Sequence, residues 1–76
     1  MINIELRLFA NLTKFLPKNH DNFPIDENIN VKQLILKLGI DIDQAKIIFI
    51  NGRKKTYEDF LKNGDRVGIF PPVGGG

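Results

Sequence analysis

The sequence predicts a small α+β domain of two layers, with a β-sheet covered on one face by a single main helix. Three observations lead to this prediction: an alternating strand pattern at the start, one well-marked amphipathic helix near the middle, and an Asn-Gly turn between two later strands. Because only one strong helix is present, it covers one sheet face and leaves the other open. A chain of 76 residues forms one domain with little room for an internal active site.

The first part of the chain is predicted to contain two short strands joined by a helical turn. Residues 12–16 carry apolar side chains at helical spacing, and Pro17 ends that turn. Residues 23–25 alternate, and Pro24 places this strand at a sheet edge because it has no N–H to donate. The first strand presents two faces, one with Ile2, Ile4, Leu6 and Leu8 and the other with Asn3, Glu5, Arg7 and Phe9.

The main helix is the best-marked element of the sequence. Asn30 is a good N-cap, and Gln33 three residues later completes a capping box. Gly39 supplies the left-handed residue at which the helix ends. The apolar stripe is predicted to be core, and it comprises Val31, Leu34, Ile35 and Leu38.

The second half of the chain is predicted to return to strands. The run 47–50 is apolar on both faces, and Asn51 with Gly52 predicts a tight hairpin turn of the primed type. Residues 53–55 form a brief return strand whose charges discourage pairing at the sheet edge. Residues 57–61 carry Tyr, Phe and Leu at helical spacing, which predicts another helical turn.

The last strand, predicted over residues 66–71, indicates a partner surface. It places Phe70 on the sheet face that the helix leaves open, and the first strand places Phe9 there. One half of the run 47–50 points the same way. Exposed apolar patches usually mark a partner surface. We therefore predict that Phe9 and Phe70, on strands expected to be neighbours, form a partner interface.

Composition excludes several classes of function. The chain has no cysteine, which excludes disulfides, thiol catalysis and cysteine-ligated metals and fits a reducing cytoplasm. The net charge of +2, from 11 basic and 9 acidic residues, is too small and too mixed to indicate nucleic acid. Glu5 and Arg7 interrupt the start of the chain, so we expect no signal peptide, and no apolar run is long enough to span a membrane.

The side chains offer no catalytic or metal-binding constellation. His20 lies in a polar turn without a second histidine or a cysteine, and is predicted to be a solvated loop residue. The carboxylate pairs Asp26 with Glu27 and Asp41 with Asp43 are of the kind expected in turns and near helix ends. General acid-base chemistry would need such groups in a pocket. We therefore expect neither a metal nor a bound cofactor.

The C-terminal stretch is the most distinctive part of the sequence. Pro71 and Pro72 fix φ and favour an extended stem, and the following glycines have no side chain to obstruct a narrow channel. The only distinctive reactive group there is the α-carboxylate of Gly76. We expect a domain over residues 1–71 and a flexible glycine tail over 72–76.

This ending resembles that of the ubiquitin-like sulfur carriers of the MoaD and ThiS family. The residues that carry the resemblance are Gly64, Asp65, Val67, Phe70, Pro71, Pro72, Val73, Gly75 and Gly76, with Gly74 at a free position. The Pro-Pro-Val-x-Gly-Gly form is most similar to the MoaD branch, which supplies the small subunit of molybdopterin synthase. The resemblance implies a β-grasp fold, with a mixed five-stranded sheet in which the first and last strands lie parallel at the centre.

The same resemblance implies a function. An adenylating enzyme of the MoeB or ThiF type would use ATP to activate the Gly76 carboxylate, and a sulfur donor would convert it to a thiocarboxylate. A MoaE-like large subunit of molybdopterin synthase would pass the sulfur to a pterin precursor. Pro71, Pro72, Val73, Gly74 and Gly75 would thread the tail into each partner, and the catalytic side chains would belong to the partners.

Three other interpretations remain open at the level of sequence. A ThiS-like carrier would deliver sulfur for the thiazole of thiamine, although the paired prolines before Val73 resemble it less. A carrier for transfer-RNA thiolation, or a protein modifier, would use the same activated terminus with another acceptor. A simple β-grasp binding module would never have its tail activated.

Overall fold

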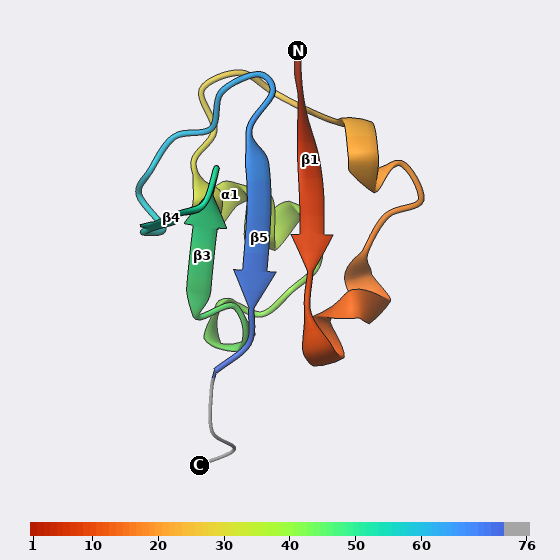
Figure 1. Ribbon diagram of the computed structural model, residues 1–76, viewed down its shortest axis with the longest axis vertical. Helices are drawn as coiled ribbons and strands as arrows, with labels where there is room; N and C mark the ends of the chain where they lie inside the picture. The colour runs from red at the N-terminus through yellow and green to blue at the C-terminus, as the bar shows by residue number, and fades with distance from the viewer. Residues whose placement is uncertain (73–76) are drawn as a thin grey trace.

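The computed structural model describes residues 1–72, and these form a mixed sheet with one main helix (Figure 1). The sheet contains five strands within these residues, in the order β2-β1-β5-β3-β4. Parallel β1 and β5 lie side by side near its centre, and every other pairing is antiparallel. The elements are β1 (Ile2–Leu8), β2 (Phe23–Ile25), α1 (Val31–Lys37), β3 (Ile47–Ile50), β4 (Arg53–Lys55) and β5 (Arg66–Phe70), with 3-10 turns at Ala10–Phe15, His20–Asn22 and Ile42–Gln44.

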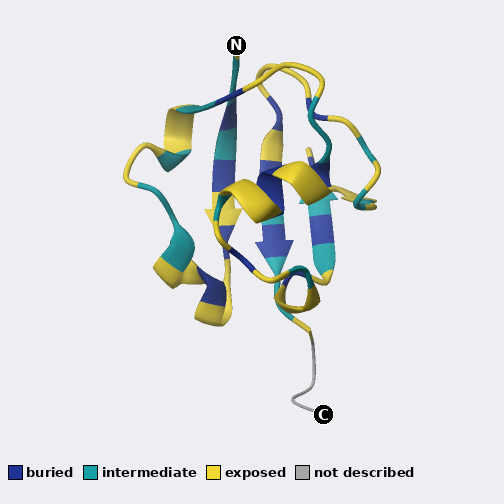
Figure 2. Cartoon of the chain, turned by 180° about the vertical axis from the view of Figure 1, so that it is seen from behind, coloured by how far each residue is buried: buried dark blue, intermediate teal, exposed yellow. Residues whose placement is uncertain are grey.

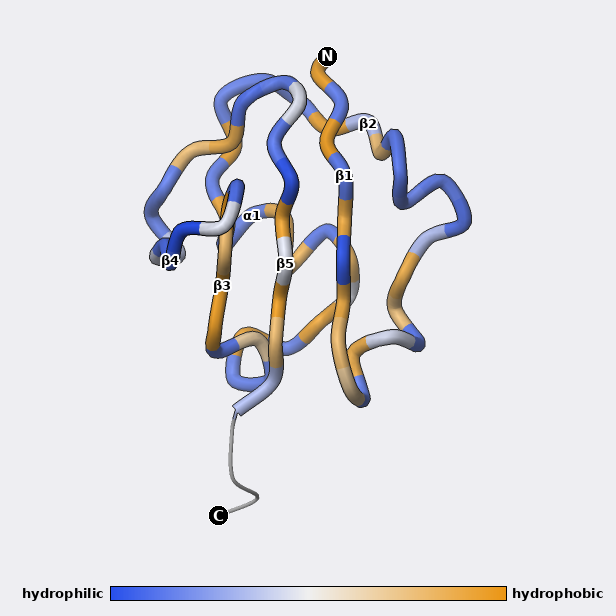
Figure 3. Tube along the Cα trace, viewed as in Figure 1, coloured by the Kyte–Doolittle hydropathy of each residue, from blue (hydrophilic) through white to orange (hydrophobic). Residues whose placement is uncertain are grey.

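Helix α1 lies across one face of the sheet, and the core is the layer between them (Figure 2). Val31, Leu34 and Ile35 on α1 are fully buried, as the apolar stripe predicted. Each such side chain contributes about 1.5 to 3 kcal/mol through burial of apolar surface. Strand β3 is hydrophobic along its length and β4 is hydrophilic, while the connecting segments carry both kinds of residue (Figure 3). Four residues of these segments, Leu12, Ile40, Ala45 and Leu61, also belong to the core. The predicted two-layer α+β class is therefore confirmed.

The boundaries of α1 follow from local hydrogen bonds. Asn30 Oδ1 accepts from the Gln33 N–H at 2.9 Å, and Gln33 Oε1 accepts from the Asn30 N–H at 2.9 Å. This is the predicted capping box, which contributes about 1 kcal/mol. Gly39 has φ 83°, and the following Ile40 N–H donates to Ile35 O at 3.2 Å. The sequence signals for the start and end of this helix are both confirmed.

The predicted hairpin between β3 and β4 is also confirmed. Asn51 has φ 54° and Gly52 has φ 81°, the positive pair that a type I′ turn requires. This turn matches the right-handed twist of the two strands, so the ladder runs directly from Ile50 opposite Arg53 to Ile48 opposite Lys55. Strands β4 and β2 are the two edges of the sheet formed by residues 1–72, and Pro24 lies in β2 as expected.

The predicted helical turn over residues 57–61 is wrong. The segment forms turns and one isolated bridge instead. Its carbonyl groups are used elsewhere: the Val31 N–H donates to Asp59 O at 3.0 Å, and the Lys32 N–H donates to Tyr57 O at 3.1 Å. The first N–H groups of a helix have no partner within the helix. The carbonyl groups of this segment therefore cap α1 and do not form the helical turn that the apolar spacing predicts.

The same segment is held by a carboxylate. Asp59 Oδ2 accepts from the Thr56 N–H at 2.8 Å and from Thr56 Oγ1 at 3.1 Å. The backbone hydrogen bond from Thr56 is the main cause that lowers the pKa of Asp59 below its ordinary value, and the Thr56 hydroxyl and nearby Lys55 act in the same direction. The folded loop therefore favours the ionised form of Asp59.

Candidate functional site

Strand β5 leads directly into the proline stem. It is paired on both sides up to its end, where the Phe9 N–H donates to Ile69 O at 3.2 Å and the Lys46 N–H donates to Phe70 O at 3.0 Å. Pro71 is half-buried and Pro72 is exposed. The stem therefore leaves from a central strand, whose position is fixed by both neighbours. The expected tail residues Val73, Gly74, Gly75 and Gly76 lie outside the described part of the chain.

Three aromatic rings gather on the sheet face opposite α1, which we call the open face. Phe9 and Phe70 stack with ring centroids 4.1 Å apart and an interplanar angle of 2°. Phe49 meets Phe70 edge-on, with centroids 5.9 Å apart and an interplanar angle of 80°. We call Phe9, Phe49 and Phe70 the aromatic patch. The predicted proximity of Phe9 and Phe70 is confirmed, and their role in binding stays a prediction.

The alternation of the strands explains why the patch is not in the core. The neighbours of its rings along the chain, Leu8, Ile48 and Ile69, point to the α1 side and are buried. The patch therefore occupies the opposite face, and Phe9 is 38% exposed there. Stacked and edge-to-face pairs contribute about 0.5 to 1.5 kcal/mol each, so the rings hold one another in place. A surface of ordered rings lies directly beside the exit of the stem.

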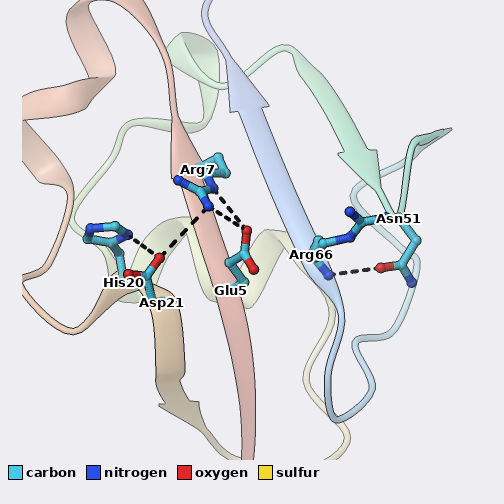
Figure 4. Close-up of polar contacts among 6 residues, drawn as sticks. All are labelled: Glu5, Arg7, His20, Asp21, Asn51 and Arg66. Atoms are coloured by element: carbon cyan, nitrogen blue, oxygen red, sulfur yellow. Dashed lines mark hydrogen bonds and ion pairs between the residues drawn. The ribbon is translucent and has the colours of Figure 1, made fainter.

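At the other end of β5, Asn51 joins the hairpin to the strand. Its Oδ1 accepts from the Arg66 N–H at 2.9 Å (Figure 4), and its Nδ2 donates to Asp65 Oδ1 at 2.9 Å. Asp65 Oδ2 also accepts from the Lys62 N–H at 2.8 Å. The Asp65 carboxylate, 9% exposed, is thus held by two donors. This network fixes the start of β5, and the backbone bonds to Ile69 O and Phe70 O hold the other end, from which the stem leaves.

A row of charged side chains lies beside the aromatic patch. Arg7 Nη2 is 2.8 Å from Glu5 Oε2 and 3.9 Å from Asp21 Oδ1 (Figure 4). His20 Nδ1 lies 3.2 Å from Asp21 Oδ1, without the geometry of a hydrogen bond. The prediction of a solvated His20 needs correction, since its side chain is only 28% exposed and packs onto this row. The sequence places it in a turn but does not show that the turn folds against β1.

No side-chain catalytic site is apparent in residues 1–72. Within them, no group of three histidine, aspartate or glutamate side chains is placed to hold a metal ion. A hollow of about 400 Å³ beside β4 is lined by both signs of charge, and its carboxylates, Asp59 and Asp65, already accept hydrogen bonds. No helix in the described region is long and apolar enough to cross a membrane. The features that stand out are the open face and the stem.

The fold described above is that of a ubiquitin-like β-grasp domain. Its defining features are the parallel β1–β5 pair near the centre of the sheet, the main helix on one face and the last strand, which leads into the proline stem. The chain belongs to the ThiS family of ubiquitin-like sulfur carriers, whose family model matches residues 6–76. The resemblance drawn from the tail is therefore confirmed at the level of the family. No curated protein matches the sequence.

Solved structures with the same fold come from several organisms. A proposed molybdopterin converting factor subunit 1 from Pyrococcus furiosus has a TM-score of 0.72 and 23% identity, over 96% of this chain and 100% of that one. SAMP1 from Haloferax volcanii has a TM-score of 0.68 and 22% identity, over 97% and 99%. The thiamine biosynthesis protein ThiS from Geobacter metallireducens has a TM-score of 0.62 and 23% identity, over 99% and 100%. At these identities the likeness establishes the fold alone.

Proposed function

We propose that this chain carries sulfur on its C-terminal residue, as a thiocarboxylate of Gly76, and delivers it to a pterin precursor as the small subunit of a molybdopterin synthase. The observation that carries the proposal is the family match, which extends over residues 6–76 and so includes the stem and the terminal glycines. The Pro-Pro-Val-x-Gly-Gly ending favours the molybdopterin branch over the thiamine branch. The chain would be both reagent and subunit, with no catalytic side chain of its own.

The chemistry explains why a partner must activate the tail. A carboxylate is a poor electrophile because its charge repels nucleophiles and its oxygens leave poorly. Attack of the Gly76 carboxylate oxygen on the α-phosphorus of ATP, with loss of pyrophosphate, would give an acyl adenylate. A sulfide-equivalent nucleophile from a sulfur donor would then displace AMP and leave the thiocarboxylate. The ATP would be bound by the adenylating enzyme, of the MoeB or ThiF type, and not by this chain.

The open face supplies what the tail lacks in binding energy. Ordering about five tail residues costs on the order of 5 to 10 kcal/mol, at roughly 1 to 2 kcal/mol per residue. Glycine contacts offset little of this cost. At about 25 cal/mol per Å², burial of some 200 to 400 Å² of apolar surface elsewhere would be needed. The aromatic patch lies beside the stem and offers such a surface to a MoaE-like subunit or an adenylating enzyme.

We expect the chain to act in the cytoplasm, where a reducing environment and ATP are available, and to bind neither nucleic acid nor membrane.

Mass spectrometry of the full-length chain, produced together with the enzymes of its own organism, tests the proposal. Exchange of one terminal oxygen for sulfur identifies a carrier. An adduct on a lysine of another protein identifies a modifier, and an unchanged mass identifies a binding module. Sulfur transfer to a pterin precursor, measured against transfer to a thiazole precursor, then separates the molybdopterin role from the thiamine role. The last two results of the mass measurement would each overturn the proposal.

The position of the reacting group is tested by changing the length of the tail. Each extended residue moves the carboxylate by about 3.3 Å, and a misplacement of about 1 Å can lower a rate by a hundredfold. Deleting Gly76, or adding one alanine after it, should therefore abolish adenylation while leaving folding and docking intact. Activation of the alanine-extended chain at the normal rate, without trimming, would show that Gly76 is not the reacting group.

A further inference from the structure

Gly68 occupies a position where glycine is unfavourable. It lies in the middle of β5, opposite Arg7 of β1 on one side and Phe49 of β3 on the other. Glycine in the interior of a strand weakens the strand, because it loses more backbone entropy on folding than other residues and has no side chain to pack. A residue that destabilises a central strand requires a reason.

Neither backbone geometry nor internal packing supplies that reason. Gly39, Gly52 and Gly64 have positive φ, but Gly68 does not, so its backbone suits any residue. A Cβ built on Gly68 would lie 3.5 Å from Phe9 Cε2 and 3.9 Å from Phe70 Cε1, which are ordinary contact distances. An alanine would therefore fit here without strain. Glycine inside a strand often marks a place where another molecule approaches the backbone closely.

A hollow lies on the open face at Gly68. Its volume is about 460 Å³, and Gly68 lines it together with Phe9, Phe49 and Phe70. The three rings give the hollow an apolar wall, against which a large apolar side chain of a partner can bury surface. At protein–protein interfaces, much of the binding energy comes from a few side chains in well-packed, desolvated pockets.

The charge at the rim of the hollow indicates what accompanies that group. Arg66, Arg7 and the carboxylate of Glu5 all line the hollow, and Glu5 lies opposite Arg66 in the β1–β5 ladder. Arg7 is already paired with Glu5 at 2.8 Å. Arg66 is exposed, and within residues 1–72 no carboxylate lies within 4 Å of its guanidinium. The rim therefore has one cation available for a carboxylate from outside the chain.

We propose that the hollow over Gly68 receives one large apolar side chain of the adenylating enzyme, and that a carboxylate beside that side chain pairs with Arg66. The inference rests on the proposed function and adds to it the place and the chemistry of docking. Gly68 is then a specificity residue: glycine makes the strand less stable than alanine would, but leaves the hollow free for the partner's side chain. Because the hollow lies beside the stem, one partner can bind in the hollow and bind the tail at the same time.

Two glycine-to-alanine substitutions with opposite expected effects test this inference. Gly68→Ala should raise the Tm by about 2 to 6 °C, because it removes the entropic cost of a strand glycine, and should raise the KM of the full-length chain for adenylation. Gly39→Ala, behind the sheet at the end of α1, should lower the Tm because alanine is strained at φ 83°, and should leave the KM unchanged. The rate is followed as ATP-dependent pyrophosphate release by the cognate adenylating enzyme.

Larger changes at the hollow should give larger effects. Gly68→Val fills more of it and should raise the KM by at least about tenfold with little change in kcat, since the tail is untouched. Arg66→Ala should also raise the KM and should weaken its dependence on salt. A normal KM for Gly68→Val, or a Tm that falls for Gly68→Ala, would overturn the inference while leaving the proposed function in place.

Two further outcomes separate the alternatives. If the wild-type chain is not adenylated at all, the proposed function fails, and the docking inference fails with it. If light scattering shows a dimer that Gly68→Val dissociates, the hollow is occupied by a second copy of the chain, and the inference is overturned in favour of self-association. A monomeric wild type that is adenylated with a lower KM than Gly68→Val is the expected result.

Discussion

Replacing Asn51 with alanine should destabilise the domain by about 3 kcal/mol, because one side chain joins the β3–β4 hairpin to the start of β5. Asn51 Oδ1 accepts from the Arg66 N–H and its Nδ2 donates to Asp65 Oδ1, each at 2.9 Å. The alanine variant loses both bonds. It also keeps a residue with a Cβ at φ 54°, where asparagine is better tolerated.

The magnitude follows from three contributions. The neutral bond to the Arg66 N–H is worth about 0.5 to 1.5 kcal/mol, and a hydrogen bond to a charged group is worth about 1.5 to 3 kcal/mol. Left-handed backbone costs alanine about 1 kcal/mol. Water reaches exposed Asn51 and replaces part of the loss, so the lower part of the summed range applies. For a domain of this size, about 3 kcal/mol lowers the Tm by on the order of 15 °C.

Asn51→Gly is the matched control, because it loses the same hydrogen bonds but accepts φ 54° without strain. It should be more stable than Asn51→Ala by up to about 1 kcal/mol. Both variants are compared with the wild type by urea and thermal unfolding, followed by circular dichroism. A loss below about 1 kcal/mol in Asn51→Ala would refute the reasoning on the hydrogen bonds. An alanine variant more stable than the glycine variant would refute the argument from φ.

Three further predictions concern the open face, the stem and the loop. Phe9→Glu should leave the domain folded but weaken binding to the adenylating enzyme, because a charge without a partner opposes burial. Leu36→Glu is the control: this position on α1 is 56% exposed, so the variant should bind normally in the same titration. Replacing both Pro71 and Pro72 with glycine should reduce kcat/KM for adenylation by about fivefold with little change in Tm. The reason is that the more flexible stem costs about 1 kcal/mol more to order on binding. A kcat/KM equal to that of the wild type would show that the stiffness of the stem is unimportant. The pKa of Asp59 is lowered in the folded state, so its contribution to stability is present above the ordinary value of 3.8 and is lost as the pH falls through the folded pKa. The Tm difference between wild type and Asp59→Ala should therefore shrink below about pH 4, and a difference that grows on acidification would contradict the sign.

Local signals in the sequence were sufficient for most elements. The capping box at Asn30, the left-handed Gly39 and the Asn51-Gly52 turn each act within a few residues, so their geometry is determined by neighbours along the chain. The alternation in β1 likewise determined which side chains face the core and placed Phe9 on the open face. The order of the strands came from the family resemblance and not from these local rules.

Tertiary contacts decided the rest, because they join residues that are distant in sequence. The apolar spacing of residues 57–61 predicts a helical turn, yet the free N–H groups of α1 take the carbonyls of this segment, and the turn does not form. His20 packs onto the row beside β1 through a fold of the loop that no local pattern encodes. The hollow at Gly68 forms where the folded sheet brings together Phe9, Phe49 and Phe70, which are distant in sequence. The sequence shows that a strand contains a glycine, but only the assembled sheet determines which side chains surround that glycine.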